Sequence, residues 1–398
     1  MPPPQQHRAL ILDGSGAREG WVRSDLPSAG EVAVEPSLVG ICGTDLGILR
    51  GERNDPAQIL GHEGIGRVVA AGPGVEGFDL GRRVVFNPVA QDDQDDVLGH
   101  NVRGLLQQRV VFSAREVAIG RLVPADPGLP ELCGPLVEPL GTVVYAHELA
   151  AQVGPPERVA IFGAGAIGLL HALYARQAGS SAIFLVASSA RRLEWAVARG
   201  IVARTEAVLA GDDAAGAIRR STGGRGVDAV FVCTPRPSAT ESLAQGLACV
   251  ARGGVVDLVA GVPDDAAAVL HSVDVAAIRR ANVCGAPRPG HVELVQTSDG
   301  KPVRLTGHRG TAPRHLRAAM ALLRAAPDRY GLVVSHLVGF GWGAEALRAL
   351  STPRRVLFGI PRIKVVIDVR DPGRSVQSFP LAPPAPRRVR RRSASPIP

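Results

Sequence analysis

Residues 158–170 read RVAIFGAGAIGLL, a short apolar run that enters three spaced glycines and continues into a second apolar run. The glycines follow the pattern G-x-G-x-x-G. In that pattern the first glycine permits a tight turn, the second lets the backbone approach a pyrophosphate, and the third lets helix and strand pack closely. The phosphate charge then lies at the helix N-terminus. The segment predicts a strand, turn and helix that bind a dinucleotide through Gly163, Gly165, Ala166, Ile167 and Gly168.

The surrounding sequence strengthens this interpretation. The motif alone is a weak indicator, because the chain holds 47 glycines and a glycine-rich turn that binds nothing is the alternative. Further apolar runs follow, however, each beside helix-like sequence: SAIFLVAS (181–188), VDAVFVCT (227–234) and GGVVDLVAG (253–261). Such a βαβ series predicts an α/β fold with a doubly wound parallel sheet and helices on both faces, a Rossmann domain.

The end of the second strand bears on which dinucleotide binds. NAD sites usually have an acidic residue there, about twenty residues after the glycines, to accept hydrogen bonds from the ribose. Here Ala187 and Ser188 occupy that position, and Arg191 and Arg192 follow. A hydroxyl residue does not repel a 2′-phosphate, and a guanidinium binds one bidentately. We therefore expect NADP(H) to be favoured over NAD(H), the alternative being that both arginines only solvate the next helix.

The flanking regions have a different texture. Residues 8–40 alternate apolar and polar positions between Gly and Pro, which is typical of strands and turns. A mixed strand and helix pattern returns after about residue 290. We expect four regions along the chain. They are the N-terminal part of a β-rich domain (1–152), a Rossmann domain (153–290), the C-terminal part of the β-rich domain (291–368) and a basic tail without fixed structure (369–398).

Composition excludes several classes of protein. Hydrophobic residues are 45% of the 398 and charged residues 21%, which is ordinary for a globular chain. No apolar run approaches the ~20 residues of a membrane span, and the N-terminus lacks a signal-peptide pattern, so we expect a cytoplasmic protein. Five scattered cysteines argue against a disulfide framework. Five tail arginines account for much of the net charge of +8, so nucleic-acid binding is not expected.

Four residues ahead of the glycine motif suggest a metal site. Cys42 lies in GICGTDL, His62 and Glu63 lie in GHEGIG, and Glu138 lies in LVEPLGTVVYAH. A thiolate, an imidazole and a carboxylate suit a four-coordinate zinc that keeps one position open. Each residue alone is weak evidence for a metal site, because a lone cysteine or histidine usually belongs to the core. Together, and before a dinucleotide fold, they form a strong combination.

The order GICGTDL, GHEGIGRVVAAGPGV, VEPLGTVVYA, VAIFGAGAIGLL resembles the zinc-dependent medium-chain dehydrogenase/reductase superfamily. It is closer to the sorbitol, threonine and glucose dehydrogenase branches than to liver-type alcohol dehydrogenases. The resemblance covers about residues 8–365. It implies a GroES-like catalytic domain interrupted by a Rossmann domain, with the active site between them.

The resemblance also implies roles for particular residues. Cys42, His62 and Glu63 would hold the zinc. Glu138 would be a nearby carboxylate that bonds the zinc-bound water or ligates the metal. Thr44 would start the proton relay from the substrate oxygen. The superfamily commonly forms dimers and tetramers, so a homo-oligomer is expected by analogy.

One stretch departs from the family. Many members carry a second, structural zinc on four closely spaced cysteines, but residues 87–110, NPVAQDDQDDVLGHNVRGLLQQRV, contain no cysteine. We therefore predict one zinc per chain. The acidic run could bind a cation, although a solvated loop is the expected role of Asp92, Asp93, Asp95 and Asp96. His100 and Asn101 either reach the cleft mouth or form a surface turn.

The substrate is less constrained. Aromatic residues are 4% of the chain, and the segments expected to face the substrate are rich in charged and hydrogen-bonding groups. This favours a polyhydroxylated substrate such as a cyclitol, aminocyclitol or sugar, and similar enzymes act on cyclitols in actinomycete secondary metabolism. His308 and Arg309 are candidate contacts, with a plain loop role as the alternative. The alternative functions are a simple secondary alcohol dehydrogenase, a zinc-free quinone or enone reductase, and a non-enzymatic nucleotide or nucleic-acid binder.

Overall fold

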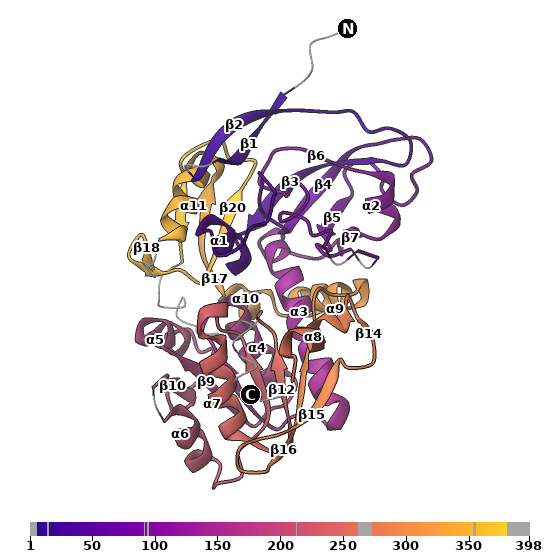
Figure 1. Cartoon of the computed structure of the whole chain (residues 1–398). Helices are drawn as coiled ribbons and strands as arrows, with labels where there is room; N and C mark the ends of the chain where they lie inside the picture. The colour runs from indigo at the N-terminus through magenta and orange to yellow at the C-terminus, as the bar shows by residue number, and fades with distance from the viewer. Residues whose placement is uncertain are drawn as a thin grey trace, which may run out of the picture.

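The computed structural model describes residues 6–13, 16–90, 92–93, 95–211, 213–261, 273–352 and 356–379. The chain forms two units (Figure 1). The upper unit in that view combines the N-terminal third of the chain with its C-terminal segment, and the lower unit contains the middle of the chain. This interrupted arrangement agrees with the expected GroES-like and Rossmann organisation.

The upper unit is built on an eight-stranded sheet. Seven strands follow the order β21-β17-β20-β3-β4-β5-β7, and β6 pairs with β3. Strand β20 lies antiparallel to β3, so the C-terminal segment completes the sheet begun by the N-terminal one. The strands are β3 (Val32–Gly40), β4 (Glu63–Ala71), β5 (Arg83–Phe86), β6 (Val110–Phe112), β7 (Leu122–Pro124), β17 (Val334–Gly339), β20 (Lys364–Asp368) and β21 (Val376–Ser378).

Smaller elements surround this sheet. They are the hairpin β1 (Gln6–Asp13) and β2 (Gly16–Arg23), the hairpin β18 (Val356–Leu357) and β19 (Ile360–Pro361), and the helices α1 (Gly43–Leu49), α2 (Ala114–Ala118) and α11 (Gly343–Ser351). Helix α10 (Pro327–Gly331) instead packs on helices of the lower unit. Helix α11 packs on β2 and α1.

The lower unit has a seven-stranded sheet in the order β10-β9-β8-β11-β12-β16-β15. All neighbours are parallel except the β15 and β16 pair. Both faces are covered by helices, so its strands are almost wholly apolar. The strands are β8 (Arg158–Phe162), β9 (Ala182–Ala187), β10 (Ala207–Leu209), β11 (Val227–Val232), β12 (Val250–Leu258), β15 (Val292–Gln296) and β16 (Pro302–Gly307).

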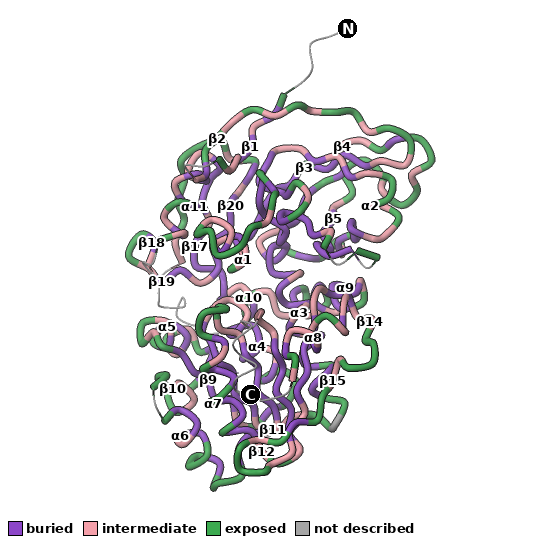
Figure 2. Tube along the Cα trace, viewed as in Figure 1, coloured by how far each residue is buried: buried purple, intermediate pink, exposed green. Residues whose placement is uncertain are grey.

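The helices of the lower unit complete the doubly wound fold. They are α4 (Ala166–Gln177), α5 (Ala190–Ala198), α6 (Ala214–Ser221), α7 (Ala239–Cys249), α8 (Val275–Arg280) and α9 (Pro313–Ala325), and a two-stranded ribbon is formed by β13 (Asn282–Val283) and β14 (Ala286–Pro287). Helix α3 (Val137–Ala150) packs on α4 and α9. Its buried residues share one apolar core with both units. Figure 2 shows the buried residues inside each unit.

Two boundaries differ from the sequence prediction. The Rossmann domain was expected to end at residue 290, but β15 and β16 belong to its sheet, so the unit extends to at least Gly307. The tail was expected to lack structure from residue 369, but β21 pairs antiparallel with β17. Residues 380–398, which include the five tail arginines, lie outside the described residues. Every helix within the described ranges is too short or too polar to span a bilayer.

Candidate active site

The predicted metal ligands lie where β3 and β4 meet. Cys42 follows β3 and is the N-cap residue of α1. His62 immediately precedes β4, and Glu63 is its first residue, paired in register with Gly40. The thiol, one imidazole nitrogen and one carboxylate oxygen of the three side chains all lie within 4.8 Å of one another. The structure thus brings together residues that are twenty positions apart in the sequence.

A buried carboxylate supports this cluster from behind. Asp45 accepts hydrogen bonds from the backbone N–H of Cys42 at 2.8 Å and of Gly61 at 3.3 Å. Its Oδ1 atom lies 3.8 Å from Nδ1 of His62. Burial lowers the pKa of His62, but the charge of Asp45 and then a hydrogen bond with Cys42 raise it to about 10. The carboxylate of Asp45 therefore favours the charged form of His62. Sequence reasoning missed Asp45, although its capping position in GTD was visible.

A buried lysine also belongs to the site. The Lys364 ammonium contacts the Glu63 carboxylate and donates to the carbonyl of Ile41 at 3.3 Å. Burial lowers the pKa of Lys364, but the charges of Glu63 and Cys42 raise it by more, so the pKa of Lys364 lies above its usual value. A side chain at Gly40 would meet Cε of Lys364 at 2.7 Å, so glycine leaves the room that the lysine occupies. Sequence reasoning missed this residue too.

The two other predicted catalytic residues lie beside the cluster. Oγ1 of Thr44 is 3.4 Å from Sγ of Cys42. Glu138 lies in the first turn of α3. Within the described residues, it does not belong to a cluster whose possible ligand atoms all lie within 4.8 Å of one another. Burial and then the charge of Glu63 raise the pKa of Glu138 to about 7. Thr44 therefore lies beside a predicted metal ligand, and Glu138 is close enough to Glu63 and His62 for their charges to affect its pKa.

The glycine motif has the geometry that a dinucleotide site requires. Gly163 follows β8 with φ of +118°, and a Cβ there would lie 2.8 Å from the Cys233 carbonyl oxygen after β11. A Cβ on Gly168 would lie 1.8 Å from the Gly163 carbonyl oxygen. Gly165, the N-cap of α4, has no atom within 4 Å of its Cβ position. The turn has no room for a side chain at Gly163 or Gly168, but it is open above Gly165. It lies where the strand order of the sheet reverses. This geometry fits a pyrophosphate.

The residues expected to select NADP(H) divide into two kinds. Ser188 and Arg191 are exposed just beyond β9 and at the start of α5. Arg192 instead donates to the Arg362 carbonyl oxygen at 2.9 Å, a contact between the two units. Ser188 and Arg191, unlike Arg192, are therefore exposed to solvent at this edge of the sheet.

Several other predicted positions differ from expectation. His308 was a candidate substrate contact, but it is buried against Tyr145 with ring centroids 4.6 Å apart, and burial lowers its pKa to about 3. In the acidic run, Asp92, Asp93 and Asp95 are exposed, as expected of a solvated loop, but Asp96 is only 12% exposed and pairs with Arg121 at 2.7 Å. Arg115 also pairs with this run. His100 is buried with its ring centroid 5.0 Å from that of His62, whereas its neighbour Asn101 is exposed.

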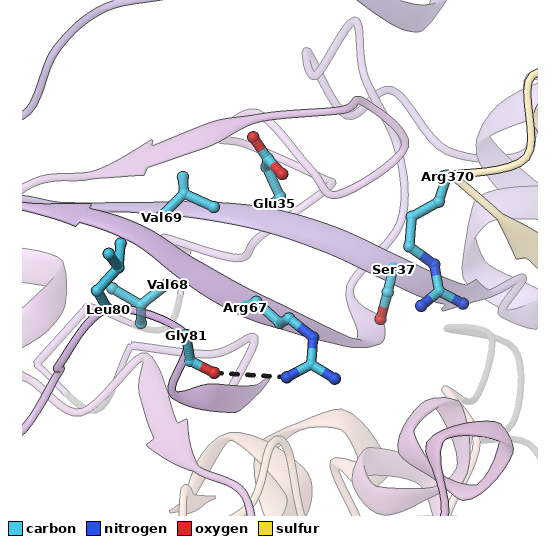
Figure 3. A pocket seen from close by; sticks show the side chains of 8 residues that line it. All are labelled: Glu35, Ser37, Arg67, Val68, Val69, Leu80, Gly81 and Arg370. Atoms are coloured by element: carbon cyan, nitrogen blue, oxygen red, sulfur yellow. Dashed lines mark hydrogen bonds between the residues drawn. The ribbon is translucent and has the colours of Figure 1, made fainter.

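Two surface cavities lie apart from these residues. One of about 330 Å³ is lined by residues of β3 and β4 together with Leu80, Gly81 and Arg370, and Figure 3 shows Arg67 in it reaching the Gly81 carbonyl. The second, of about 540 Å³, shares Glu35 and Arg370 with the first. None of the predicted site residues lines either cavity, so the site is defined by its side chains and not by these hollows.

Comparison with known proteins agrees with both units. Residues 28–122 match the family described as the alcohol dehydrogenase GroES-like domain, and residues 166–297 match the zinc-binding dehydrogenase family. The chain is 30% identical over 275 residues to L-threonine 3-dehydrogenase of Pyrococcus horikoshii, covering 63% of this chain and 74% of the relative.

Two further similarities extend this comparison. The chain is 32% identical over 238 residues to 2-dehydro-3-deoxy-L-galactonate 5-dehydrogenase of Pseudoalteromonas atlantica. That match covers 55% of this chain and 66% of the relative, so the chain spans just under two thirds of its length. Among solved structures, a candidate zinc-binding dehydrogenase of Sinorhizobium meliloti, bound to NADP, has the same fold with a TM-score of 0.68 and 22% identity, over 92% of this chain and 99% of that one.

Proposed function

The chain belongs to the zinc-dependent medium-chain dehydrogenase/reductase superfamily, and from this premise we propose that it transfers a hydride between NADP(H) and a secondary alcohol or ketone of a polyhydroxylated substrate. The observation that carries the proposal is the convergence of Cys42, His62 and Glu63 within 4.8 Å. Sulfur, nitrogen and oxygen donors on three residues form the kind of set that holds a catalytic zinc and leaves a position for substrate.

The bound groups would supply the central chemistry. When bound by Cys42, His62 and Glu63, zinc would supply Lewis acidity toward the substrate oxygen, and NADP(H) bound at the glycine turn would supply or take up the hydride. The protein's own part is to hold the ligands, orient the substrate and move its proton. Asp45 orients His62, and Lys364 restrains the Glu63 carboxylate. Such supporting contacts fix the orientation of metal ligands.

Proton transfer is assigned to Thr44. Its hydroxyl lies 3.4 Å from the Cys42 thiol, so it would lie near a substrate oxygen on a zinc held by Cys42. In alcohol oxidation Oγ1 of Thr44 accepts the substrate proton while passing its own proton onward, and the reverse transfer accompanies ketone reduction. The Glu138 carboxylate, next to the same cluster, orients the substrate hydroxyl or a water molecule.

Cofactor selection is assigned to the edge of the Rossmann sheet. Gly163, Gly165 and Gly168 form the pyrophosphate turn, with the backbone of Ala166 and Ile167 at the start of α4. Ser188 and Arg191 bind the 2′-phosphate, because both are exposed where an acidic residue would otherwise repel it. Arg192 supports this edge through its contact with Arg362.

The polyhydroxylated class has independent support. The relatives named for a deoxygalactonate and for threonine carry polar, hydroxyl-bearing substrates in their names. We propose a cytoplasmic homo-oligomer that binds one zinc per chain and acts on a cyclitol or sugar derivative. Simple ketones serve as the competing substrate class in the test.

The test is nicotinamide oxidation by the purified protein. NADPH and NADH are offered separately with polyol ketones, ketoses and simple ketones, with and without a zinc chelator. Turnover of a polyol ketone with NADPH, abolished by the chelator and restored by zinc, supports the proposal. Turnover that ignores the chelator, or that is confined to simple ketones, contradicts it.

A further inference from the structure

The two halves of the proposed cofactor site lie on opposite sides of β8. The glycine turn follows β8, and the residues proposed to bind the 2′-phosphate, Ser188 and Arg191, follow β9 on one side of it. Strands β11, β12 and β16 lie in that order on the other side. A dinucleotide lies across the carboxyl ends of the strands, at the point where their order reverses. With the adenosine half over β9, the nicotinamide half would extend over the ends of β11, β12 and β16.

Arg279 lies against the ends of two of these strands. Its Nη2 atom donates to the carbonyl oxygen of Val259, directly after β12, at 3.2 Å. A Cβ on Gly261 would lie 3.6 Å from Nη1 of the arginine. A Cβ on Gly307, the last residue of β16, would lie 2.7 Å from its Cγ, so the glycine leaves room for the arginine. Since neighbouring strands are about 4.8 Å apart, the guanidinium lies about 10–15 Å across the sheet from the glycine turn.

The guanidinium is held in place without being saturated. Helix α8 packs on β16, and Ile278, next to Arg279, is buried. Figure 1 shows this helix at the end of the lower unit that faces the upper unit. Within the described residues, Nε of Arg279 is buried and has no hydrogen-bond partner, and its side chain donates only to Val259. A buried donor of this kind is costly unless something pairs with it.

The protein balances the charge of Arg279 only in part. Asp257 lies two positions before Val259 on β12, about 7 Å further back along the strand. Both of its carboxylate oxygens are buried and, among the described residues, accept no hydrogen bond, so the acid and the arginine are not paired. Burial raises the pKa of Asp257 to about 7, with Arg279 opposing the effect, so the acid is only partly ionised near neutral pH. Burial lowers the pKa of Arg279 to about 10, which leaves the guanidinium charged.

We propose that Arg279 lies beside the nicotinamide ring and makes the site bind NADPH in preference to NADP⁺. This inference rests on the proposed function and adds a residue that discriminates between the two redox states of the cofactor. The oxidised ring carries a positive charge that the reduced ring lacks, so a fixed guanidinium repels only the oxidised form. Hydride uptake removes that charge, so the same repulsion favours hydride transfer to the bound NADP⁺, which is the direction of alcohol oxidation.

The experiment measures Kd for NADPH and for NADP⁺ with the zinc-loaded protein, by nucleotide fluorescence and by calorimetry. We expect the ratio of Kd for NADP⁺ to Kd for NADPH to fall by about 5- to 50-fold in Arg279→Met, the size expected for two charges about 7 Å apart at a partly buried site. A purely structural role would raise both Kd values together and leave their ratio unchanged. An unchanged ratio in Arg279→Met would therefore overturn the inference.

Further variants test the sign of the effect. Asp257→Asn should raise the ratio at pH 8, where the carboxylate is more fully ionised, because the guanidinium then loses its partial counter-charge. Arg279→Lys keeps a positive charge and should retain most of the wild-type ratio, whereas Arg279→Gln should repeat the result of Arg279→Met if the methionine variant does not fold. Arg280→Met is the matched control, because Arg280 adjoins Arg279 on α8 but is exposed and pairs with Asp274 at 3.0 Å. This control should keep the wild-type ratio.

Failure of the inference and failure of the proposed function give different results. If the protein binds both nucleotides and the ratio is the same in wild type, Arg279→Met and Arg279→Gln, the inference is overturned and the proposed function stands. If the protein binds neither nucleotide, the proposed function is contradicted and the inference falls with it. If NADH binds more tightly than NADPH, the Kd ratio for NAD⁺ and NADH decides the inference by the same criterion.

Discussion

Lys364 and Glu63 form an ion pair across 301 residues of sequence, and each side chain is only 2% exposed. The pair joins β20 to β4 at the metal cluster. A buried carboxylate needs a compensating charge, and the protein provides one before any metal is present. The lysine and the zinc that we propose would therefore share the same carboxylate.

Replacing the lysine should make stability depend on zinc. Lys364→Met leaves Glu63 buried and uncompensated, at a cost of about 3–5 kcal/mol in the metal-free protein. Zinc supplies the missing charge, so the zinc-induced rise in Tm should be larger than in the wild type. The Glu63→Gln/Lys364→Met double variant is the control, which should recover stability but lose the enlarged zinc effect. Equal zinc-induced shifts in all proteins would contradict the pairing.

Metal content gives a direct test of the three ligands. We expect one zinc per chain in the wild type and less than about 0.2 in Cys42→Ser, because the remaining two donors cannot hold the ion tightly. Elemental analysis after dialysis measures this. Cys133→Ala, a buried cysteine of the shared core, should keep its zinc. Two zinc ions per chain would contradict the prediction of a single zinc.

The three glycines should respond differently to alanine. Gly168→Ala forces a Cβ to 1.8 Å from the Gly163 carbonyl, so the turn must shift and Tm should fall by several degrees. Gly165→Ala meets no protein atom, so Tm should stay near the wild-type value while Kd for NADPH rises about tenfold or more. Gly211→Ala, also in open space, is the control for both effects. Nucleotide fluorescence and thermal melts separate the two outcomes.

The neighbouring arginines Arg191 and Arg192 should separate cofactor choice from stability. Arg191→Ala should raise KM for NADPH about 10- to 100-fold and leave KM for NADH within about twofold, because a 2′-phosphate contact is a charged hydrogen bond. Arg192→Ala should lower Tm and affect both cofactors alike, because it breaks the contact with Arg362 between the units. An unchanged NADPH preference in Arg191→Ala would refute its assigned role.

Acid should destabilise the protein through two buried histidines. His147 and His171 lie 5.2 Å apart by ring centroid; burial lowers the pKa of His147 to about 3 and that of His171 well below its usual value. Both are neutral when folded, whereas the unfolded chain binds protons below about pH 6.5. Stability is therefore complete above pH 6.5 and declines below it, by about 2 kcal/mol per histidine at pH 5.

Urea unfolding at pH 7.5 and pH 5 measures this loss. His171→Phe should show a smaller difference between the two pH values than the wild type, since one buried titrating histidine is gone. His291→Gln, at a partly exposed position, should behave like the wild type. An identical pH dependence in His171→Phe would show that the acid sensitivity arises elsewhere.

The sequence patterns predicted the features that depend on residues close together in the chain. The Gly163 turn lies between a strand and a helix that follow directly, and Cys42 and His62 adjoin strands that pair in register. Lys364 was missed because a lysine in KVVID carries no local sign that it will meet Glu63. The Rossmann boundary was placed too early because β15 and β16 form an antiparallel hairpin, which has the same texture as the β-rich unit. Strand β21 was missed because three residues in a polar segment show no periodicity.

The position of β20 between β17 and β3 has a consequence for protein synthesis. Domains generally fold as the chain emerges, and the strands of the Rossmann unit are complete once Gly307 has left the ribosome. The sheet that carries Cys42 and Glu63 must wait for residues 364–368. Strand β6 pairs with residues 32–34 of β3, but residues 38–40, the end of β3 next to Cys42, have no partner on that side until β20 arrives. The nascent chain therefore completes its nucleotide-binding half first, and the proposed metal site gains its lysine only after the strands of the Rossmann unit have been made.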